Sequence, residues 1–231
     1  MIRDNVHRIF EEIDSVSRKV GRGPKDITLV AVTKYSPLAA VEEAIAAGVT
    51  HIAENRVQDA AEKYRSLSPD RTKVTKHMIG HLQTNKVKTV LEIFDVIQSV
   101  DSLKLAQTID KHAAAVNKVF DIFLEVNTSG EEQKYGVPLA EALALVDQIL
   151  PLSCVRIQGL MTMAPLTEDQ QWVRSTFRKL RELREQINQK YKGNPKIEMK
   201  YLSMGMSSDY KIAIEEGSNM VRIGSAIFRK E

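Results

Sequence analysis

Two hydrophobic periods alternate along the 231-residue chain. Over residues 2–20, apolar positions recur every three or four residues with charged residues between them, which predicts an amphipathic helix. ITLVAVT at 27–33 is instead a short, nearly continuous apolar run rich in β-branched residues, which is typical of a strand covered on both faces. We therefore predict a leading helix followed by a buried strand.

The same two patterns recur through the rest of the chain. Further strands are predicted at 51–55, 77–80, 96–100, 120–127, 156–163, 201–206 and 220–228. Helices are predicted at 38–47, 57–64, 85–91, 102–115, 139–150, 168–189 and 209–216. Because strands alternate with helices, we expect parallel βαβ units in an α/β fold: a single (β/α)8 TIM barrel over residues 1–231 with an extra N-terminal helix. An open doubly wound sheet is the alternative.

Composition narrows the function classes only slightly. The 33 Lys and Arg residues against 30 Asp and Glu residues give a formal charge of +3, so a nucleic-acid partner is not expected. No apolar stretch reaches the roughly 20 residues of a membrane-spanning helix, and the N-terminal residues lack the apolar core of a signal peptide. We expect a cytoplasmic protein without a membrane partner. Cys154 is the single cysteine, so neither an internal disulfide nor a cysteine-based metal cage can form, and no metal site is predicted.

Polar residues gather at the predicted carboxyl ends of the strands, where barrels carry their chemistry. Lys34 is the only lysine placed directly at such an end. A lysine in a partly apolar pocket loses hydration, which favours the free amine that condenses with an aldehyde to form a Schiff base. The alternatives are that Lys34 extends to solvent or pairs with Glu54.

Two small-residue segments near the end of the sequence suggest a phosphate site. MGMSSD at 204–209 precedes a predicted helix, and RIGSA at 222–226 lies in the last predicted strand. Ser207, Ser208, Gly224 and Ser225 could supply hydroxyl and amide hydrogens to a phosphate. Alternatively, Ser207 is an ordinary helix cap and Gly224 a packing glycine. An aldehyde-binding amine together with a phosphate cradle points to pyridoxal 5'-phosphate (PLP).

A family resemblance agrees with this interpretation. AVTKYSP, HIAENRVQD, HMIGHLQTNK, VNTSGEEQKYG, GLMTM and LSMGMSSDYKIAIEEGSNMVRIGSAIF together resemble the pyridoxal phosphate homeostasis proteins of the YggS/PROSC type. The resemblance implies a barrel similar to the N-terminal domain of alanine racemase, with PLP held as an internal aldimine. The positions that it implies for cofactor binding are Lys34 for the aldimine, Ser207, Gly224 and Ser225 for the phosphate, Arg222 near the pyridine nitrogen, and Asn55, His81, Met204 and Gly205 in the pocket wall.

Arg222 bears directly on what the cofactor could do. A permanently charged arginine beside the pyridine nitrogen keeps that nitrogen unprotonated and weakens carbanion stabilisation. Alternatively, Arg222 forms an ion pair with a rim carboxylate such as Glu125. His81 could stack on the cofactor ring, accept a proton or simply pack, and Asn55 could bind the ring hydroxyl or anchor its own loop.

The sequence ends at Glu231, soon after the last predicted strand. We expect no counterpart of the second domain of alanine racemase, which contributes the opposing tyrosine base, and we expect Tyr35 and Tyr210 to pack or bond locally. We therefore expect no catalytic residue and no efficient catalysis, but a monomer that holds PLP and supplies it to PLP-dependent apoenzymes in vitamin B6 and amino-acid homeostasis. The alternatives are a weak amino-acid racemase, a Schiff-base aldolase, or a regulatory module that contacts a partner through a surface helix.

Overall fold

The barrel is built from parallel strands, and a computed structural model describes residues 1–68 and 73–229 of it. Glu231, where the sequence ends, lies outside the described residues. The strands are β1 (Thr28–Val32), β2 (His51–Glu54), β3 (Thr75–Met78), β4 (Val96–Val100), β5 (Phe120–Asn127), β6 (Val137–Pro138), β7 (Val155–Met161), β8 (Ile197–Ser203) and β9 (Met220–Ile223). Within the described ranges, eight of them pair in the order β4-β3-β2-β1-β9-β8-β7-β5, and a β4–β5 pairing closes the ring. The TIM-barrel prediction is therefore confirmed, and the open sheet is wrong.

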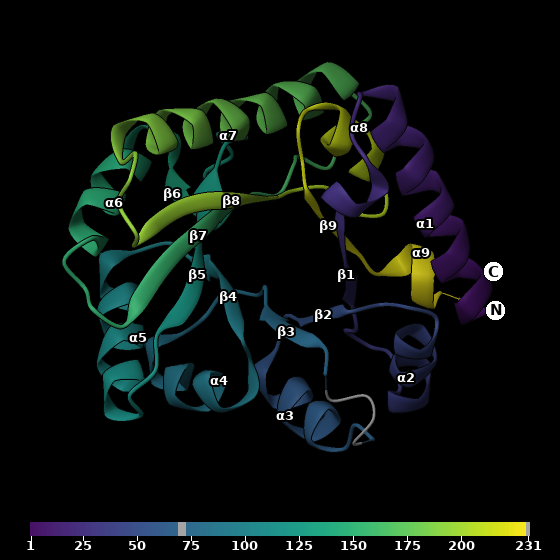
Figure 1. The fold of residues 1–231 in the computed structure, drawn as a ribbon, viewed down its shortest axis with the longest axis horizontal. Coiled ribbons are helices and arrows are strands. Elements are labelled where there is room, and N and C mark those ends of the chain that lie inside the picture. Colours follow the sequence, from purple (N-terminus) through teal and green to yellow (C-terminus); the bar gives the residue numbers. More distant parts are fainter. Residues whose placement is uncertain (69–72, 230–231) are drawn as a thin grey trace.

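Helices surround the strands (Figure 1). The α-helices are α1 (Ile2–Lys19), α2 (Leu38–Ala46), α3 (Val57–Arg65), α4 (Val87–Ile93), α5 (Leu103–Ala115), α6 (Ala142–Ile149), α7 (Gln170–Lys190), α8 (Tyr210–Glu215) and α9 (Ser225–Phe228). Three 3-10 turns, η1 (Pro24–Asp26), η3 (Thr84–Lys86) and η4 (Leu139–Glu141), join them within the described residues. Side chains cap two of the long helices: Ser102 Oγ accepts from the Leu105 amide, and the Asp169 carboxylate accepts from the Gln171 and Trp172 amides.

Two apolar layers hold the barrel together. The larger core lies between strands and helices, and it takes alternate strand residues such as Leu29, Ala31 and Ile52. The smaller core fills the barrel interior with Val30, Val32, Ala53, Phe123, Met161 and Met220. Side chains along a strand alternate between these layers, so a strand such as β1 is apolar at consecutive positions of the sequence.

Two predicted strands differ clearly from the structure, and one short strand is not among the predictions. Residues 137–138 pair with the end of β5 as β6. The predicted strand at 201–206 begins earlier, at Ile197, and ends at Ser203. The predicted strand at 220–228 ends at Ile223, and Ser225–Phe228 form α9 instead. A short apolar run does not distinguish a buried strand from a buried turn of helix, which explains this last error.

The extra N-terminal helix α1 supports the two C-terminal helices. Glu12 on α1 forms an ion pair with Lys211 at 2.6 Å and accepts a hydrogen bond from the Tyr210 hydroxyl. These partners lower the pKa of Glu12 to about 2, Lys211 most strongly. Asn5 donates to the Ile227 carbonyl at 3.0 Å. α1 therefore fixes α8, which follows the first predicted phosphate segment, and α9, which begins within the second.

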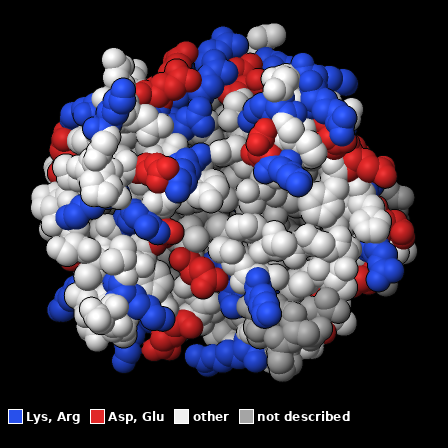
Figure 2. All heavy atoms as spheres, in the orientation of Figure 1, with Lys and Arg blue, Asp and Glu red and all other residues white. Residues whose placement is uncertain are grey.

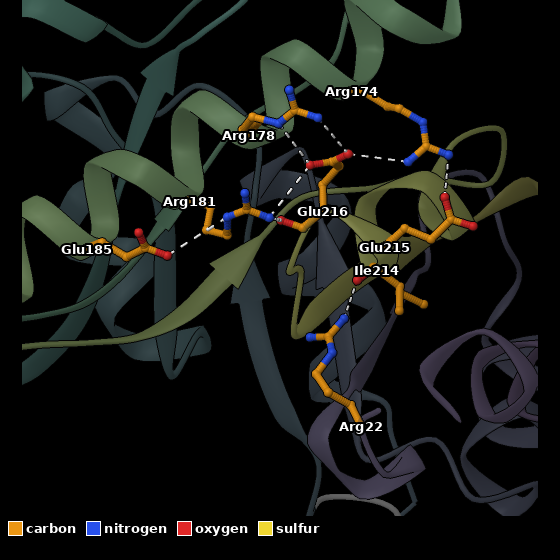
Figure 3. Close-up of polar contacts among 8 residues, drawn as sticks. All are labelled: Arg22, Arg174, Arg178, Arg181, Glu185, Ile214, Glu215 and Glu216. Carbon is orange, nitrogen blue, oxygen red and sulfur yellow. Dashed lines mark hydrogen bonds and ion pairs between the residues drawn. The ribbon is translucent and has the colours of Figure 1, made fainter. Parts of the chain in front are cut away.

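A group of charged side chains fastens α8 to α7, and we call it the Glu216 cluster: Arg174, Arg178, Arg181, Glu215 and Glu216 (Figure 3). The buried Glu216 carboxylate lies 3.3 Å from Arg174 Nη1, 3.4 Å from Arg178 Nη2 and 3.6 Å from Arg181 Nη1. Arg174 also pairs with Glu215. Three guanidinium groups thus converge on one carboxylate at the end of α8.

Arg22 holds the other side of α8. It donates to the Ile214 carbonyl (Figure 3) and, at 2.7 Å, to the Ser218 carbonyl. Since α1, α7 and Arg22 all contact α8, the segment that leads into this helix is anchored from several directions.

Charges of both signs are interspersed on the face shown in Figure 2, and no large area of that face carries one sign. Across the described residues, no helix combines the length and apolarity needed to cross a bilayer.

Candidate functional site

The predicted site residues lie at one end of the barrel, beyond the interior core. Val32, Ala53 and Met220 face the interior, and side chains two positions further along a strand share that face. The next such positions are Lys34, Asn55, His81, Glu125, Ser203 and Arg222. Four of them, Lys34, Asn55, His81 and Arg222, are sequence-predicted cofactor residues, and they therefore lie at four strand ends around one mouth.

Lys34 is the second residue after β1, and its side chain is exposed. Among the described residues, none forms a hydrogen bond or ion pair with its amine. Glu54, the alternative partner, is fully buried and pairs with Lys63 at 2.6 Å. Thr33 is fixed as well, because its hydroxyl donates to Glu54 at 2.9 Å and its carbonyl accepts from Lys63 at 2.7 Å. The structure thus holds the backbone before Lys34 firmly and leaves the amine accessible, which agrees with the alternative that Lys34 extends to solvent rather than with a partly apolar pocket.

Asn55 and His81 line a pocket of about 350 Å³ beside this mouth. Gly80 allows the two strand ends to approach, since a Cβ there would lie 2.1 Å from the Asn55 carbonyl oxygen. The His81 ring stacks on Tyr135, with centroids 4.2 Å apart, and its Nδ1 lies 3.5 Å from Asp101 Oδ2. The structure thus shows His81 packed against Tyr135, a side chain that the sequence did not single out, and its role toward a cofactor stays a prediction.

The segment after β8 runs against the end of β9. Met204 is buried and its amide donates to the Met220 carbonyl at 3.1 Å, while the Gly205 carbonyl accepts from the Arg222 amide at 2.9 Å. Gly205 has φ of +98°, and a Cβ would lie 2.6 Å from that of Ala213, so only glycine fits. The chain therefore turns sharply here toward Ser207.

Ser207 joins the two predicted phosphate segments. Its hydroxyl oxygen accepts from the Ala226 amide at 3.2 Å, so its own hydrogen remains available as a donor. Ser208, next to Ser207, and Ser225, next to Ala226, are exposed. Gly224 is half-buried against Val32, and a Cβ on it would lie 3.3 Å from the Val32 carbonyl oxygen. Ser207 is not the cap of α8, because Asp209 occupies the N-cap position.

Arg222 is buried at the centre of the mouth and retains its charge among neutral groups. Its Nη1 donates to the Ser203 carbonyl at 2.7 Å and to the Ser203 hydroxyl at 2.8 Å, and its Nη2 donates to the Thr162 carbonyl at 2.8 Å. Burial lowers the pKa of Arg222 to about 10, while Glu125 and Asp209 act in the opposite direction. No carboxylate of the described residues lies within ion-pair distance, so the alternative pair with Glu125 is not formed.

Glu125 contributes a second buried charge-bearing group at the end of β5. Burial raises the pKa of its carboxyl to about 7, and repulsion from Asp101 adds to the rise. The nearby Arg222 charge lowers it only in part. Glu125 therefore titrates near neutral pH within the mouth.

Sequence reasoning missed Tyr135, Gln98 and Ser203. Tyr135 lies between β5 and β6, in a segment without strand or helix periodicity, and nothing in its neighbourhood indicated a contact with His81. Gln98 and Ser203 are fully buried polar residues inside predicted strands, and their interior-facing positions were the signal available.

Comparison with known proteins places the chain in a family. A family model for the alanine racemase N-terminal domain matches residues 5–230. The pyridoxal phosphate homeostasis protein of Aquifex aeolicus is 39% identical over 225 residues, covering 97% of this chain and 96% of that protein.

Solved structures agree. The structure of PipY from Synechococcus elongatus with PLP bound is 34% identical, with a TM-score of 0.85, covering 99% of this chain and 100% of that chain. Alanine racemase from Clostridium difficile is 12% identical with a TM-score of 0.78, covering 99% of this chain and 60% of that chain, which is a likeness of fold alone. The chain therefore belongs to the alanine racemase N-terminal domain family and, within it, to the pyridoxal phosphate homeostasis proteins.

Proposed function

We propose that this chain binds PLP covalently through Lys34 and serves in PLP homeostasis, by holding the cofactor and releasing it without efficient catalysis. The observation that carries the proposal is the placement of Lys34 and Arg222 at one mouth: an accessible amine, and a buried cation without a carboxylate partner among the described residues. When bound, PLP supplies an aldehyde that reacts reversibly with an amine and a ring that draws electrons.

The donor set fits each part of the cofactor. The accessible Lys34 amine suits the aldehyde, and the Ser207 and Ser225 hydroxyls with the Gly224 cradle suit the phosphate. Arg222 uses Nη1 and Nη2 on protein oxygens, and its Nε–H has no acceptor among the described residues, which suits a ring nitrogen. Asn55 and His81 would line the pocket wall, with Met204, Gly205 and Ser208 at the phosphate end.

The same residues argue against efficient catalysis. Arg222 opposes protonation of a ring nitrogen, which limits electron withdrawal by the ring. Two-sided proton transfer needs a second base opposite Lys34, and Tyr210 is buried with its hydroxyl bonded to Glu12 on α1. We accordingly propose a monomeric cytoplasmic PLP carrier formed by residues 1–231 as one domain, with PLP-dependent apoenzymes as recipients.

The test is the absorption spectrum of purified protein mixed with PLP, before and after borohydride reduction, for the wild type, Lys34→Ala and Lys118→Ala. Lys118 is an exposed lysine that precedes β5 at the opposite end of the barrel, so its variant is the matched control. We expect a visible band and a reduced adduct located on Lys34 by peptide mass, both lost only in Lys34→Ala. A wild-type protein that stays colourless with PLP would contradict the proposal and favour the alternative in which Lys34 serves a Schiff-base aldolase.

A further inference from the structure

A chain of hydrogen bonds crosses the barrel interior and ends on Arg222. His51 Nδ1 lies 2.9 Å from His77 Nε2, and His77 Nδ1 lies 2.9 Å from Gln98 Nε2. Gln98 Oε1 accepts from Ser203 Oγ at 2.6 Å, and Ser203 Oγ accepts from Arg222 Nη1 at 2.8 Å. These five residues come from β2, β3, β4, β8 and β9, so the chain spans the barrel rather than following one strand.

The hydrogen bonds all run in one direction, from donor to acceptor, and Arg222 determines that direction. A guanidinium can only donate, so Ser203 accepts from Arg222 and gives its own hydrogen to Gln98 Oε1. The Gln98 amide nitrogen then has two hydrogens for two partners, His77 Nδ1 and, at 3.3 Å, the Met220 sulfur. Flipping the amide would leave a donor facing Ser203 and an acceptor facing the sulfur, which satisfies fewer groups.

The direction fixes the form of His77. Its Nδ1 must accept from Gln98, so its hydrogen sits on Nε2 and is donated to His51 Nδ1. The ring has to be neutral for this, and burial lowers the pKa of His77 to about 3, with repulsion from His51 adding to the effect. Burial also lowers the pKa of His51, although Asp95 acts in the opposite direction. Every member of the chain is thus satisfied without a carboxylate.

From this arrangement we infer that Gln98 and Ser203 are positioning residues that hold the Arg222 guanidinium, with its charge intact, in the orientation that PLP binding requires. The inference rests on the proposed function and deepens it. An arginine oriented by an ion pair would lose much of its effect on a ring nitrogen, because the carboxylate would cancel the charge. Ser203 and Gln98 orient the guanidinium without cancelling its charge, and the Arg222 Nε–H has no acceptor in the part of the chain that the structure describes.

The first arm of the test uses nuclear magnetic resonance on the whole protein without added PLP. Ring nitrogen shifts of wild-type His77 should show the neutral form with hydrogen on Nε2, and Gln98→Glu should move that hydrogen to Nδ1, because a carboxylate cannot donate. Exchange of the Arg222 guanidinium hydrogens should be at least about tenfold faster in Ser203→Ala. Ser99→Ala is the matched control, since Ser99 is a buried serine on β4 next to Gln98 and its hydroxyl has no partner among the described residues. Wild-type His77 with hydrogen on Nδ1, or unchanged Arg222 exchange in Ser203→Ala, would overturn the inference.

The second arm measures PLP affinity by equilibrium dialysis. We expect Ser203→Ala and Gln98→Leu to bind about threefold to tenfold more weakly than the wild type, Ser203→Thr to recover wild-type affinity through its hydroxyl, and Ser99→Ala to match the wild type. Wild-type affinity in Ser203→Ala would contradict the positioning role. Failure of the wild type itself to take up PLP would instead contradict the proposed function, and the resonance arm would still decide whether Gln98 and Ser203 hold Arg222.

Discussion

The Glu216 cluster and Arg222 present arginines in opposite settings. Three guanidinium groups share the buried Glu216 carboxylate on the outside of the barrel, between α7 and α8 (Figure 3). Arg222, inside the mouth, is surrounded by the neutral oxygens of Ser203 and Thr162. Opposite charges that meet at a helix junction hold the helices together. A buried cation among neutral acceptors is not neutralised by a carboxylate, so its positive potential can act on a ligand. The difference predicts which substitutions cost stability and which cost binding.

The largest loss of stability is expected for Glu216→Gln. The substitution removes the carboxylate at the centre of the cluster and leaves three guanidinium groups to repel one another. Removing one partner of a fully buried pair typically costs about 3–5 kcal/mol. Because Arg174, Arg178 and Arg181 are 28%, 52% and 32% exposed, we expect a smaller loss of about 2 kcal/mol in the free energy of unfolding, measured with urea.

The neighbouring Glu215→Gln serves as the control for Glu216→Gln. Glu215 is 36% exposed and pairs only with Arg174 in the cluster, so we expect a loss below about 1 kcal/mol. Equal losses for the two variants would show that the convergence on Glu216 adds nothing to an ordinary surface pair.

The next largest effect is a gain of stability for Glu125→Gln at alkaline pH. The pKa of Glu125 is raised to about 7 in the folded state from an ordinary value of 4.5. The folded state therefore holds a proton that the unfolded chain has lost, so the contribution of Glu125 to stability falls as pH rises from about 4.5 to 7 and is level beyond that range. We expect the variant to be more stable by about 2 kcal/mol at pH 8 and no different at pH 4.

Urea unfolding at the two pH values checks the Glu125 prediction. Asp121→Asn, on the same strand but paired at the surface with Arg156 at 2.7 Å, should show no such gain at pH 8. A gain for Glu125→Gln that is the same at pH 4 as at pH 8 would contradict a raised pKa as its cause.

Much of the barrel could be predicted from sequence because its strands and helices have different periods. Strands 96–100 and 120–127 were predicted with the bounds that the structure gives them. The error at 220–228 arose because a four-residue helix has no period to detect, and the two-residue strand β6 is too short to show one.

The site was partly predictable for a related reason. Lys34, Asn55 and Arg222 stand at strand ends, where sequence order alone assigns them to one mouth. Ser203 and Gln98 act through partners that are distant along the chain, and no local pattern encodes such contacts. Exposure of Lys34 was one of the alternatives drawn from the sequence, but the choice between it and a partly apolar pocket depends on how neighbouring loops cover the mouth.

Glu12→Gln tests whether the loss in the free energy of unfolding depends on the burial of the carboxylate rather than on the number of its partners. Glu12 also joins α8 to a neighbouring helix, but its side chain is 27% exposed, and Lys211 and Tyr210 lower its pKa to about 2. Its stabilisation is therefore present above about pH 4.5 and is lost as pH falls toward 2. We expect a loss of about 0.5–1 kcal/mol at pH 7 that disappears near pH 2, measured by urea unfolding. A loss as large as that of Glu216→Gln would show that the number of paired groups matters more than burial.

The smallest effect on stability is expected for Arg222→Gln, although Arg222 is among the most buried charged residues described. The depressed pKa of Arg222 means that its burial costs the folded state free energy, and Gln removes that cost while losing hydrogen bonds to Ser203 and Thr162. The two terms offset, so we expect the free energy of unfolding to change by less than about 0.5 kcal/mol, while PLP affinity falls at least about tenfold. Urea unfolding and equilibrium dialysis on the same preparation separate the two results. A loss of stability comparable to that of Glu216→Gln, with affinity unchanged, would make Arg222 a structural arginine like those of the Glu216 cluster and remove the contrast between the two settings.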